Sequence, residues 1–431
     1  MKSATDLGAR EICLTAHHEG GFALWPSNFT TYSVRAATAW RGGNGDVLRE
    51  FADAANRWNV SICYYLNVAC DHYQTTVQKF TPKQFIDAQV GMLREVLTQY
   101  GPVNRFWFDG TTGYPAGTDV QELWSRAYET IRTVSPATMI SPYRGDICAA
   151  IDTVYTNGGP APNSTDTSAC TKGGGGGGAQ YFHPTEMHGI TAQMGPDGNT
   201  DSLPTYWFWH PWACAGNVSG CPWVGHANAS RMFDMYEFSV GHGAVLNFNA
   251  PAERTGRMNA SLAAAMAEAG AALNATFRAP PLAALAGAPA SGPCAAPLII
   301  ELPGGGGQPV DYVVSMEDLA FGQRIANYSF DYQAVGSTAW EVLVPPVPAN
   351  ATGALGDRPD GHDPRDSHVG HKRVDRPVPA TGARAGAARV RVARVRFNCL
   401  AALAEPIHVR SIELRERQVP WEAEWRGPPR K

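Results

Sequence analysis

One aspartate in this sequence has the setting of a catalytic carboxylate. The stretch "NRFWFDG", residues 104–110, runs through apolar residues to Asp109 and stops at a glycine. An Asp-Gly pair is common in turns, so Asp109 could be a turn residue. It could also be a carboxylate that a buried strand holds rigidly in a site, as a nucleophile or a general acid or base requires.

Polar side chains also end two other apolar runs. His17 and His18 end "EICLTAHH", and Tyr65 lies near the end of "VSICYYLNV". Both histidines could instead be core residues whose ring nitrogens bond to backbone groups. A metal site formed by His17, His18 and Glu19 is disfavoured, because adjacent residues on a strand point to opposite faces.

Alternating strands and helices are predicted over the first 275 residues, which indicates a parallel sheet. The strands are expected at 11–17, 60–68, 104–110, 137–143 and 243–249, and the helices at 45–58, 81–100, 118–134, 229–240 and 257–273. No glycine-rich nucleotide loop follows a strand, and the run of glycines at 173–178 lacks the Lys-Ser/Thr of a phosphate loop. A barrel of parallel strands would bring Asp109 and His18 to one end, where the active sites of such barrels lie.

Composition narrows the class of protein. The chain has 431 residues, a formal net charge of −4 and 44% hydrophobic residues, and its isoelectric point is near 6.3. This charge gives no reason to expect nucleic acid or an anionic membrane as a partner. No apolar run reaches the roughly 18 residues that a membrane span needs. We therefore predict a soluble protein with one large and one smaller domain.

Two features indicate the secretory route. Asn-x-Ser/Thr occurs nine times, at Asn28, Asn59, Asn163, Asn217, Asn228, Asn259, Asn274, Asn327 and Asn350. Nine cysteines are present, and Cys214 and Cys221 bracket a short segment that could form a small disulfide loop. Scattered buried thiols are the alternative. The first residues contain no signal-peptide apolar region, so we expect that the N-terminus is missing.

Four segments together resemble the glycoside hydrolase family 29 α-L-fucosidases. They are "LTAHHEGGFALWPS" (14–27), "GDVLREFADA" (45–54), "QVGMLREVLTQYGPVNRFWFDG" (89–110) and "VLNFNAPAERTGRM" (245–258). The resemblance implies a (β/α)8 barrel and a retaining α-L-fucosidase that needs no metal or organic cofactor. It implies that Asp109 is the nucleophile, since the family's aspartate follows a "W-x-D" strand.

The resemblance also suggests the acid/base residue. In the branch active on α-1,3/1,4-linked fucose, a glutamate in a "P-x-E" segment precedes a "W-F-x-H" run. Here Glu186 in "YFHPTEMHGI" precedes "YWFWH" (206–210) after an insertion. Glu19 and Glu237 are rival candidates. We expect Glu186 to lie on a long loop, where its environment could raise its pKa for proton donation.

The remaining site residues also follow from the resemblance. In register with the family's "KHHDGF", His17 replaces the lysine and His18 keeps the first histidine, and both are expected to bind the sugar. Trp107 matches a sugar-stacking position, Tyr65 a strand-end tyrosine, and Arg144 an arginine near the sugar.

The C-terminal third is predicted to be a second domain. Residues 1–275 form the catalytic barrel, 276–295 an Ala/Pro linker, and 296–431 a β-sandwich with a disordered loop near 349–370. The sandwich could bind carbohydrate or brace the barrel.

A departure from the family pattern leaves alternatives for function. The family's first strand, which ends in His-Trp-Gly, has no counterpart here, so the barrel is expected to lack its first β/α unit. The expected function is hydrolysis of terminal fucose from glycans or glycoproteins by a secreted or vacuolar/lysosomal enzyme. The alternatives are an inactive carbohydrate-binding relative and a barrel glycosidase that acts on another sugar. The oligomeric state is left open.

Overall fold

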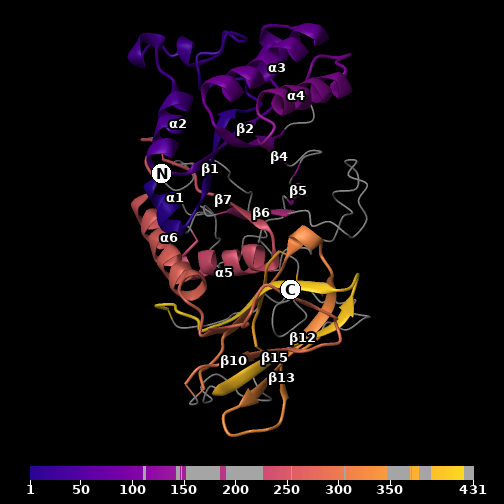
Figure 1. Ribbon diagram of the computed structural model, residues 1–431. Coiled ribbons are helices and arrows are strands. Elements are labelled where there is room, and N and C mark those ends of the chain that lie inside the picture. Colours follow the sequence, from indigo (N-terminus) through magenta and orange to yellow (C-terminus); the bar gives the residue numbers. More distant parts are fainter. Residues whose placement is uncertain are drawn as a thin grey trace, which may run out of the picture. The chain divides into compact units, whose positions relative to one another are not determined.

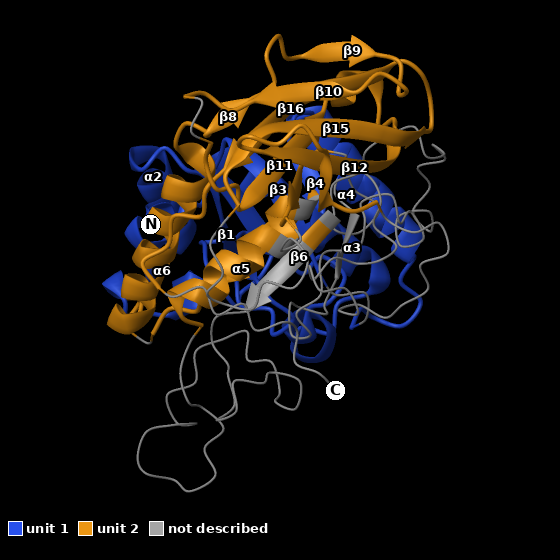
Figure 2. Cartoon of the chain, turned by 90° about the horizontal axis from the view of Figure 1, so that it is seen from below, with its two compact units in different colours: residues 1–149, 172–174 blue, residues 150–171, 175–431 orange. Residues whose placement is uncertain are grey.

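The computed structural model describes most of the chain, in two compact units. The described residues are 1–109, 113–141, 146, 148–151, 185–190, 227–253, 255–304, 307–346, 369, 371–377 and 390–421. The first unit comprises residues 1–149, and the described residues from 150 onward form the second (Figure 2). Within these described ranges, no helix combines the length and the apolar character that crossing a bilayer requires.

The first unit is a parallel sheet of four strands in the order β1-β2-β3-β4. Figure 1 labels β1, β2 and β4 of this sheet. The strands are β1 (Glu11–His17), β2 (Ser61–Leu66), β3 (Val103–Phe108) and β4 (Met139–Ser141), and the helices are α1 (Lys2–Leu7), α2 (Val47–Arg57), α3 (Pro82–Gln99) and α4 (Val120–Val134). One of the helices α2, α3 and α4 lies between each consecutive pair of strands in the chain. The predicted alternation is confirmed in this unit.

Local sequence signals explain where the helices begin. Thr81 caps α3 in a capping box with Gln84, and Pro82 follows at the first helical position. Asp46 and Asp119 cap α2 and α4 by accepting a hydrogen bond from a backbone N–H of the first turn. These caps fix the ends of the loops that lead from the strands into the helices.

The two faces of the sheet have different surroundings. Tyr64, Leu66, Phe106 and Phe108 belong to the hydrophobic core with residues of α2, α3 and α4. The alternate positions point away from these helices because side chains on a strand alternate between faces. They include Tyr65 and Trp107, which are cross-strand neighbours.

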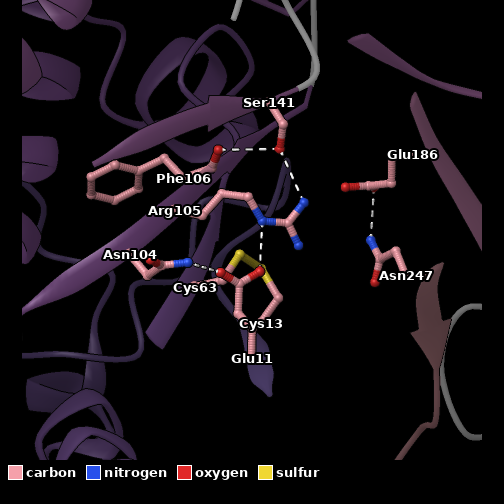
Figure 3. The surroundings of a disulfide bond; sticks show 9 residues. All are labelled: Glu11, Cys13, Cys63, Asn104, Arg105, Phe106, Ser141, Glu186 and Asn247. Atoms are coloured by element: carbon pink, nitrogen blue, oxygen red, sulfur yellow. Dashed lines mark hydrogen bonds and ion pairs between the residues drawn. A yellow bond between two sulfur atoms is a disulfide. The ribbon is translucent and has the colours of Figure 1, made fainter. Parts of the chain in front are cut away.

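A disulfide and an ion pair occupy this second face towards the beginning of the strands. Cys13 and Cys63 are cross-strand neighbours on β1 and β2 and form a disulfide (Figure 3). The Arg105 guanidinium lies 2.7 Å from a Glu11 carboxylate oxygen and also donates to Ser141 (Figure 3). The sequence reasoning did not identify this disulfide.

The second unit contains parallel strands, helices and two antiparallel sheets. Its first elements are β5 (Cys148–Ile151), which crosses the unit boundary, β6 (Thr185–Ile190), α5 (Ala229–Ser239), β7 (Val245–Asn249) and α6 (Ala260–Leu273). Strands β6 and β7 pair in parallel, and α5 lies between them in the chain. Strand–helix alternation therefore occurs in this unit as well.

The antiparallel sheets form a sandwich. One has the order β10-β15-β12-β13 and the other β14-β11-β16-β8, with β9 also paired to β16. Their strands are β8 (Ala283–Ala284), β9 (Ala290–Gly292), β10 (Leu298–Glu301), β11 (Tyr312–Glu317), β12 (Ile325–Ala334), β13 (Glu341–Val344), β14 (Arg373–Asp375), β15 (Val392–Ala402) and β16 (Ile407–Arg415). Phe330 and Phe397 of one sheet share a core with Ile412 and Leu414 of the other.

The segment predicted as a linker, 276–295, differs from that expectation. It contains β8 and β9, which pair with β16. Cys294 at its end forms a disulfide with Cys399 of β15. The Ala/Pro composition hid these short strands because they carry few large apolar residues.

Helix α5 packs against the sandwich through a buried polar cluster. The Tyr312 hydroxyl donates to a Glu237 oxygen at 3.0 Å, and Arg376 donates to the same oxygen at 2.8 Å. Phe233 and Phe277 join the apolar contacts around this cluster. Glu237, one rival for the acid/base role, is therefore buried in a structural network with an arginine.

Asp234 should make stability depend on pH. Burial raises its pKa to about 6, the Glu237 carboxylate adds to this, and Arg376 and Arg417 oppose it. A raised carboxyl pKa means that the folded state binds the proton more tightly than the unfolded state does. The contribution of Asp234 to the free energy of unfolding is therefore fully present below about pH 4 and is lost as pH rises through about 6. The Asp234→Asn variant should gain up to about 3 kcal/mol relative to wild type as pH rises through this window.

The measurement is the difference in urea midpoint between variant and wild type from about pH 2.5 to about pH 7.5. Asp87 provides a control with the opposite sign, because hydrogen bonds from Lys83 and Arg126 hold the pKa of its carboxyl below the usual value. Asp87→Asn should lose stability relative to wild type as pH rises to about 4, and the difference should stay constant above about pH 5. A difference for Asp234→Asn that stays flat with pH would contradict the structural reading of this cluster.

Candidate active site

Asp109 lies directly after β3, at the carboxyl end of the first sheet. Its backbone N–H donates to the Leu66 carbonyl at 3.2 Å, which continues the sheet pairing by one residue. Its side chain accepts a 2.7 Å hydrogen bond from the Tyr65 hydroxyl. The carboxylate is thus held by the two neighbouring strand ends.

Three rings form a row across the ends of β1, β2 and β3. His18 stacks on Tyr65 with centroids 5.4 Å apart, and Tyr65 stacks on Trp107 at 5.2 Å. Both pairs are nearly parallel, with interplanar angles of 5° and 11°. The structure therefore brings together His18, Tyr65, Trp107 and Asp109 beside one another.

Tyr65 is a permanent hydrogen-bond donor at this site. Burial raises its pKa well above the ordinary value, and the hydrogen bond to Asp109 and the charges of Asp109 and Glu19 raise it further. The phenol consequently keeps its proton through the whole physiological range. It can hold one Asp109 oxygen in a fixed position.

His17 lies on the other side of the strand from this row. It pairs in register with Leu66, a core residue on the helix side, after a bulge between Thr15 and His17. Its side chain is 1% exposed, and its Nε2 lies 3.1 Å from an Asp71 oxygen. This geometry does not support the expected sugar contact, because the bulge turns His17 away from the ring row.

Glu19 and Cys70 lie next to the site on the loops after β1 and β2. The Cys70 thiol donates to a Glu19 oxygen at 3.9 Å. Burial raises the pKa of Cys70 to about 11, and the charges of Glu19, Asp71 and Asp109 add to this. Cys70 is therefore a neutral thiol and not a nucleophile near neutral pH.

Glu186 belongs to the second unit. It is the second residue of β6, paired in register with Val245 of β7, and is fully buried. Asn247 donates from its side-chain amide to a Glu186 oxygen at 3.0 Å (Figure 3). The expectation of a long loop was wrong, since the residues after "HP" continue as a strand beside β7.

Other predicted features lie outside the described residues. Arg144, the Cys214–Cys221 segment and the aromatic run 206–210 are among them. Over the described part of the chain, no group of three or more His, Cys, Asp or Glu is arranged to hold a metal ion.

Sequence reasoning missed Asp71, which is fully buried beside His17. A signal was present: a charged residue in "NVACDHYQ", directly after a buried strand, must either be exposed or find a partner. Nothing in the sequence alone identified that partner.

Comparison with known proteins agrees with the fold. Two solved structures share the barrel-and-sandwich fold. A glycoside hydrolase 29 family member from an unknown rumen bacterium is 22% identical, with a TM-score of 0.69 over 100% of this chain and 70% of that one. A Ruminococcus gnavus GH29 fucosidase in complex with fucose is 19% identical, with a TM-score of 0.67 over 97% and 84%. The predicted fold class is thus confirmed.

Sequence comparisons find similar proteins as well. Residues 1–156 match the family model described as Alpha-L-fucosidase. Alpha-L-fucosidase 1 of Arabidopsis thaliana is 27% identical over 256 residues, which cover 59% of this chain and 47% of the relative. The chain spans about half the length of the curated relatives it matches.

Proposed function

We propose that the protein is a retaining α-L-fucosidase that hydrolyses terminal α-L-fucosyl residues of glycans or glycoproteins. The observation that carries the proposal is the Asp109 carboxylate, held by Tyr65 beside the His18–Tyr65–Trp107 ring row. It lies within the residues that match the family model. A carboxylate fixed next to aromatic rings suits a sugar whose ring packs on an aromatic face while its anomeric carbon is attacked.

The proposed mechanism has two displacements. Asp109 attacks the anomeric carbon and forms a fucosyl-enzyme, while Glu186 donates a proton to the departing glycosidic oxygen. Glu186 then removes a proton from a water that attacks the same carbon, which releases fucose and restores Asp109. Trp107, His18, Tyr65 and Arg144 are proposed to contact the sugar, and no metal or organic cofactor takes part.

The linkage is a finer part of the proposal. The "P-x-E" segment at Glu186 favours the α-1,3/1,4-active branch of glycoside hydrolase family 29, so branched fucosylated glycans are the proposed partners. Asn247 beside Glu186 gives that carboxylate a hydrogen-bond donor from the neighbouring strand.

A panel of aryl glycosides tests the activity directly. The chain is expected to release the aryl group from the α-L-fucoside far faster than from the galactoside or glucoside, with the β-fucoside inert. Faster cleavage of the galactoside would mean that the enzyme acts on another sugar and not on fucose. Binding of fucose without turnover, measured by calorimetry, would favour an inactive carbohydrate-binding relative instead.

We propose a secreted or vacuolar/lysosomal location. The nine Asn-x-Ser/Thr sites support it, and so do the disulfides Cys13–Cys63 and Cys294–Cys399, because such bonds persist in oxidising compartments.

The structure ranks the glycosylation sites for a test. Asn59 and Asn274 are exposed, whereas Asn327 lies in β12 with its side-chain oxygen buried. Asn259 accepts hydrogen bonds as the cap of α6 and donates to Glu253. Mass spectrometry of the chain secreted from eukaryotic cells should find glycans at Asn59 and Asn274 and none at Asn327. A fully occupied Asn327, or no glycan at any site, would count against the proposed route or the ranking.

A further inference from the structure

We propose that Asp71 is a positioning residue of the active site, which acts through His17 to hold the segment that carries His18. This inference rests on the proposed function for its kinetic consequence, but not for its geometry. Asp71 does not contact the ring row in this role. It acts from the opposite side of β1, below the residues that would meet the sugar.

The Asp71 carboxylate is fully buried and bonded at both oxygens. One oxygen accepts from the Gln74 backbone N–H at 2.8 Å, and the other faces His17 Nε2 at 3.1 Å. Gln89 of α3 donates to the second oxygen at 3.4 Å and to the Gln74 side chain at 2.9 Å. A buried carboxylate needs such partners, and here they come from three different segments.

His17 is consequently fixed in orientation and in tautomer. A carboxylate only accepts hydrogen bonds, so Nε2 carries a proton where it faces Asp71. Because both side chains are at most 1% exposed, water cannot replace this bond at low cost. His17 directly precedes His18, so the peptide between them is held in place as well.

Backbone contacts join the same two loops. The Asn67 N–H donates to the His17 carbonyl at 3.1 Å, and the His72 N–H donates to the Glu19 carbonyl at 2.8 Å. Asp71 lies between these two contacts in the chain. The loop after β1 and the loop after β2 are thus tied together on both sides of the His17–Asp71 bond.

Gly21 shows how closely the first loop wraps the carboxylate. Its φ is +89°, and a Cβ at this position would lie 2.3 Å from an Asp71 oxygen. Only glycine fits both the backbone conformation and the space. The loop that carries His18 and Glu19 therefore folds directly around Asp71.

Loss of the His17–Asp71 bond is expected to affect the ring row. His18 stacks on Tyr65, and Tyr65 donates to Asp109. If the His17–Asp71 bond is lost, the His18 ring gains freedom to leave its stacked position. We expect weaker fucose binding and slower turnover, since residues that orient a ligand-binding side chain commonly contribute about 10–100-fold.

The decisive variant is Asp71→Asn, with Glu11→Gln as the matched control. Glu11 pairs with Arg105, which is 4% exposed, towards the beginning of the same strands, so its loss perturbs the same sheet away from the ring row. On the aryl α-L-fucoside, at a temperature where both variants are folded, kcat/KM should fall about 10–100-fold for Asp71→Asn and less than about 3-fold for Glu11→Gln. An equal fall in both would mean that Asp71 contributes only to stability.

Two His17 variants distinguish the effect of the hydrogen bond to Asp71 from the effect of the side chain's volume. His17→Gln keeps an N–H donor towards Asp71, whereas His17→Phe keeps the ring shape and removes the donor. We expect kcat/KM to be at least 10-fold higher for the glutamine variant than for the phenylalanine variant. The reverse order would overturn the proposal.

A measurement that does not depend on catalysis tests the positioning role of Asp71 separately from the proposed function. In ¹⁵N-histidine NMR of the whole chain, His17 should show a slowly exchanging Nε2–H, and the His18 ring signals should shift in Asp71→Asn but not in Glu11→Gln. If wild type cleaves no fucoside, the proposed function fails while this measurement still tests Asp71. Unchanged His18 signals in Asp71→Asn would overturn the positioning role.

Discussion

Replacing Asp109 by glycine is expected to lower turnover of an aryl α-L-fucoside by about 10⁴-fold or more. The nucleophile of a retaining glycosidase forms the covalent intermediate, so its loss removes the main route to product. Tyr65 would remain as a donor without its carboxylate, 2.7 Å from where an Asp109 oxygen had been. The cavity left by glycine would admit a small anion.

Reaction with azide tests whether Asp109 is the nucleophile, which a loss of activity alone does not show. An azide ion in that cavity should attack the α-fucoside from the same side and give β-fucosyl azide, which NMR distinguishes from the α anomer. Asp119→Asn is the matched control, because Asp119 caps α4 in the same unit and asparagine caps equally well. If Asp109→Gly keeps more than a tenth of wild-type activity, Asp109 is not the nucleophile.

Replacing Glu186 by alanine should affect substrates according to their leaving group. A natural fucosylated glycan needs a proton on its departing oxygen, and loss of a general acid costs about 10²–10⁴-fold. An aryl fucoside with an acidic phenol leaves unaided, so its first step should be spared. Asn247→Ala is a useful companion, because it removes the 3.0 Å donor to Glu186 and leaves the carboxylate present.

Glu19 offers the clearest contrast to Glu186. It is an exposed carboxylate on the loop after β1, in contact with Cys70. If Glu186→Ala slows both classes of substrate equally, or neither, and Glu19→Ala slows only the glycan, the acid/base role belongs to Glu19. The Asp109 assignment would stand in either case, since it rests on a different strand.

The fold was predictable where periodicity and caps agreed. Residues 81–100 were expected to form a helix, and in the structure Thr81, Pro82 and Gln84 set its start. The strands around Tyr65 and Trp107 were apolar runs of ordinary length, bounded by turn signals. Strands β8 and β9 escaped notice because a two- or three-residue strand of alanine, serine and glycine has no pattern of its own and forms only by pairing with β16.

The site was predictable only in part. Asp109 stood out because it ends a strongly apolar strand. His17 was expected to bind the sugar, and a bulge between Thr15 and His17 places its side chain away from the ring row. Asp71 lay hidden because its partners, His17 and Gln89, come from distant parts of the chain. Tertiary contacts of this kind leave no local trace in a sequence.

The Cys294–Cys399 disulfide has a practical consequence for anyone who handles the protein. It joins residues 105 positions apart, from the segment before β10 to β15. A protease that cuts once anywhere between them would leave two pieces covalently joined. Such nicked material would migrate as intact chain on a gel without reductant and would separate into two bands only after thiol treatment, so purity should be judged under both conditions.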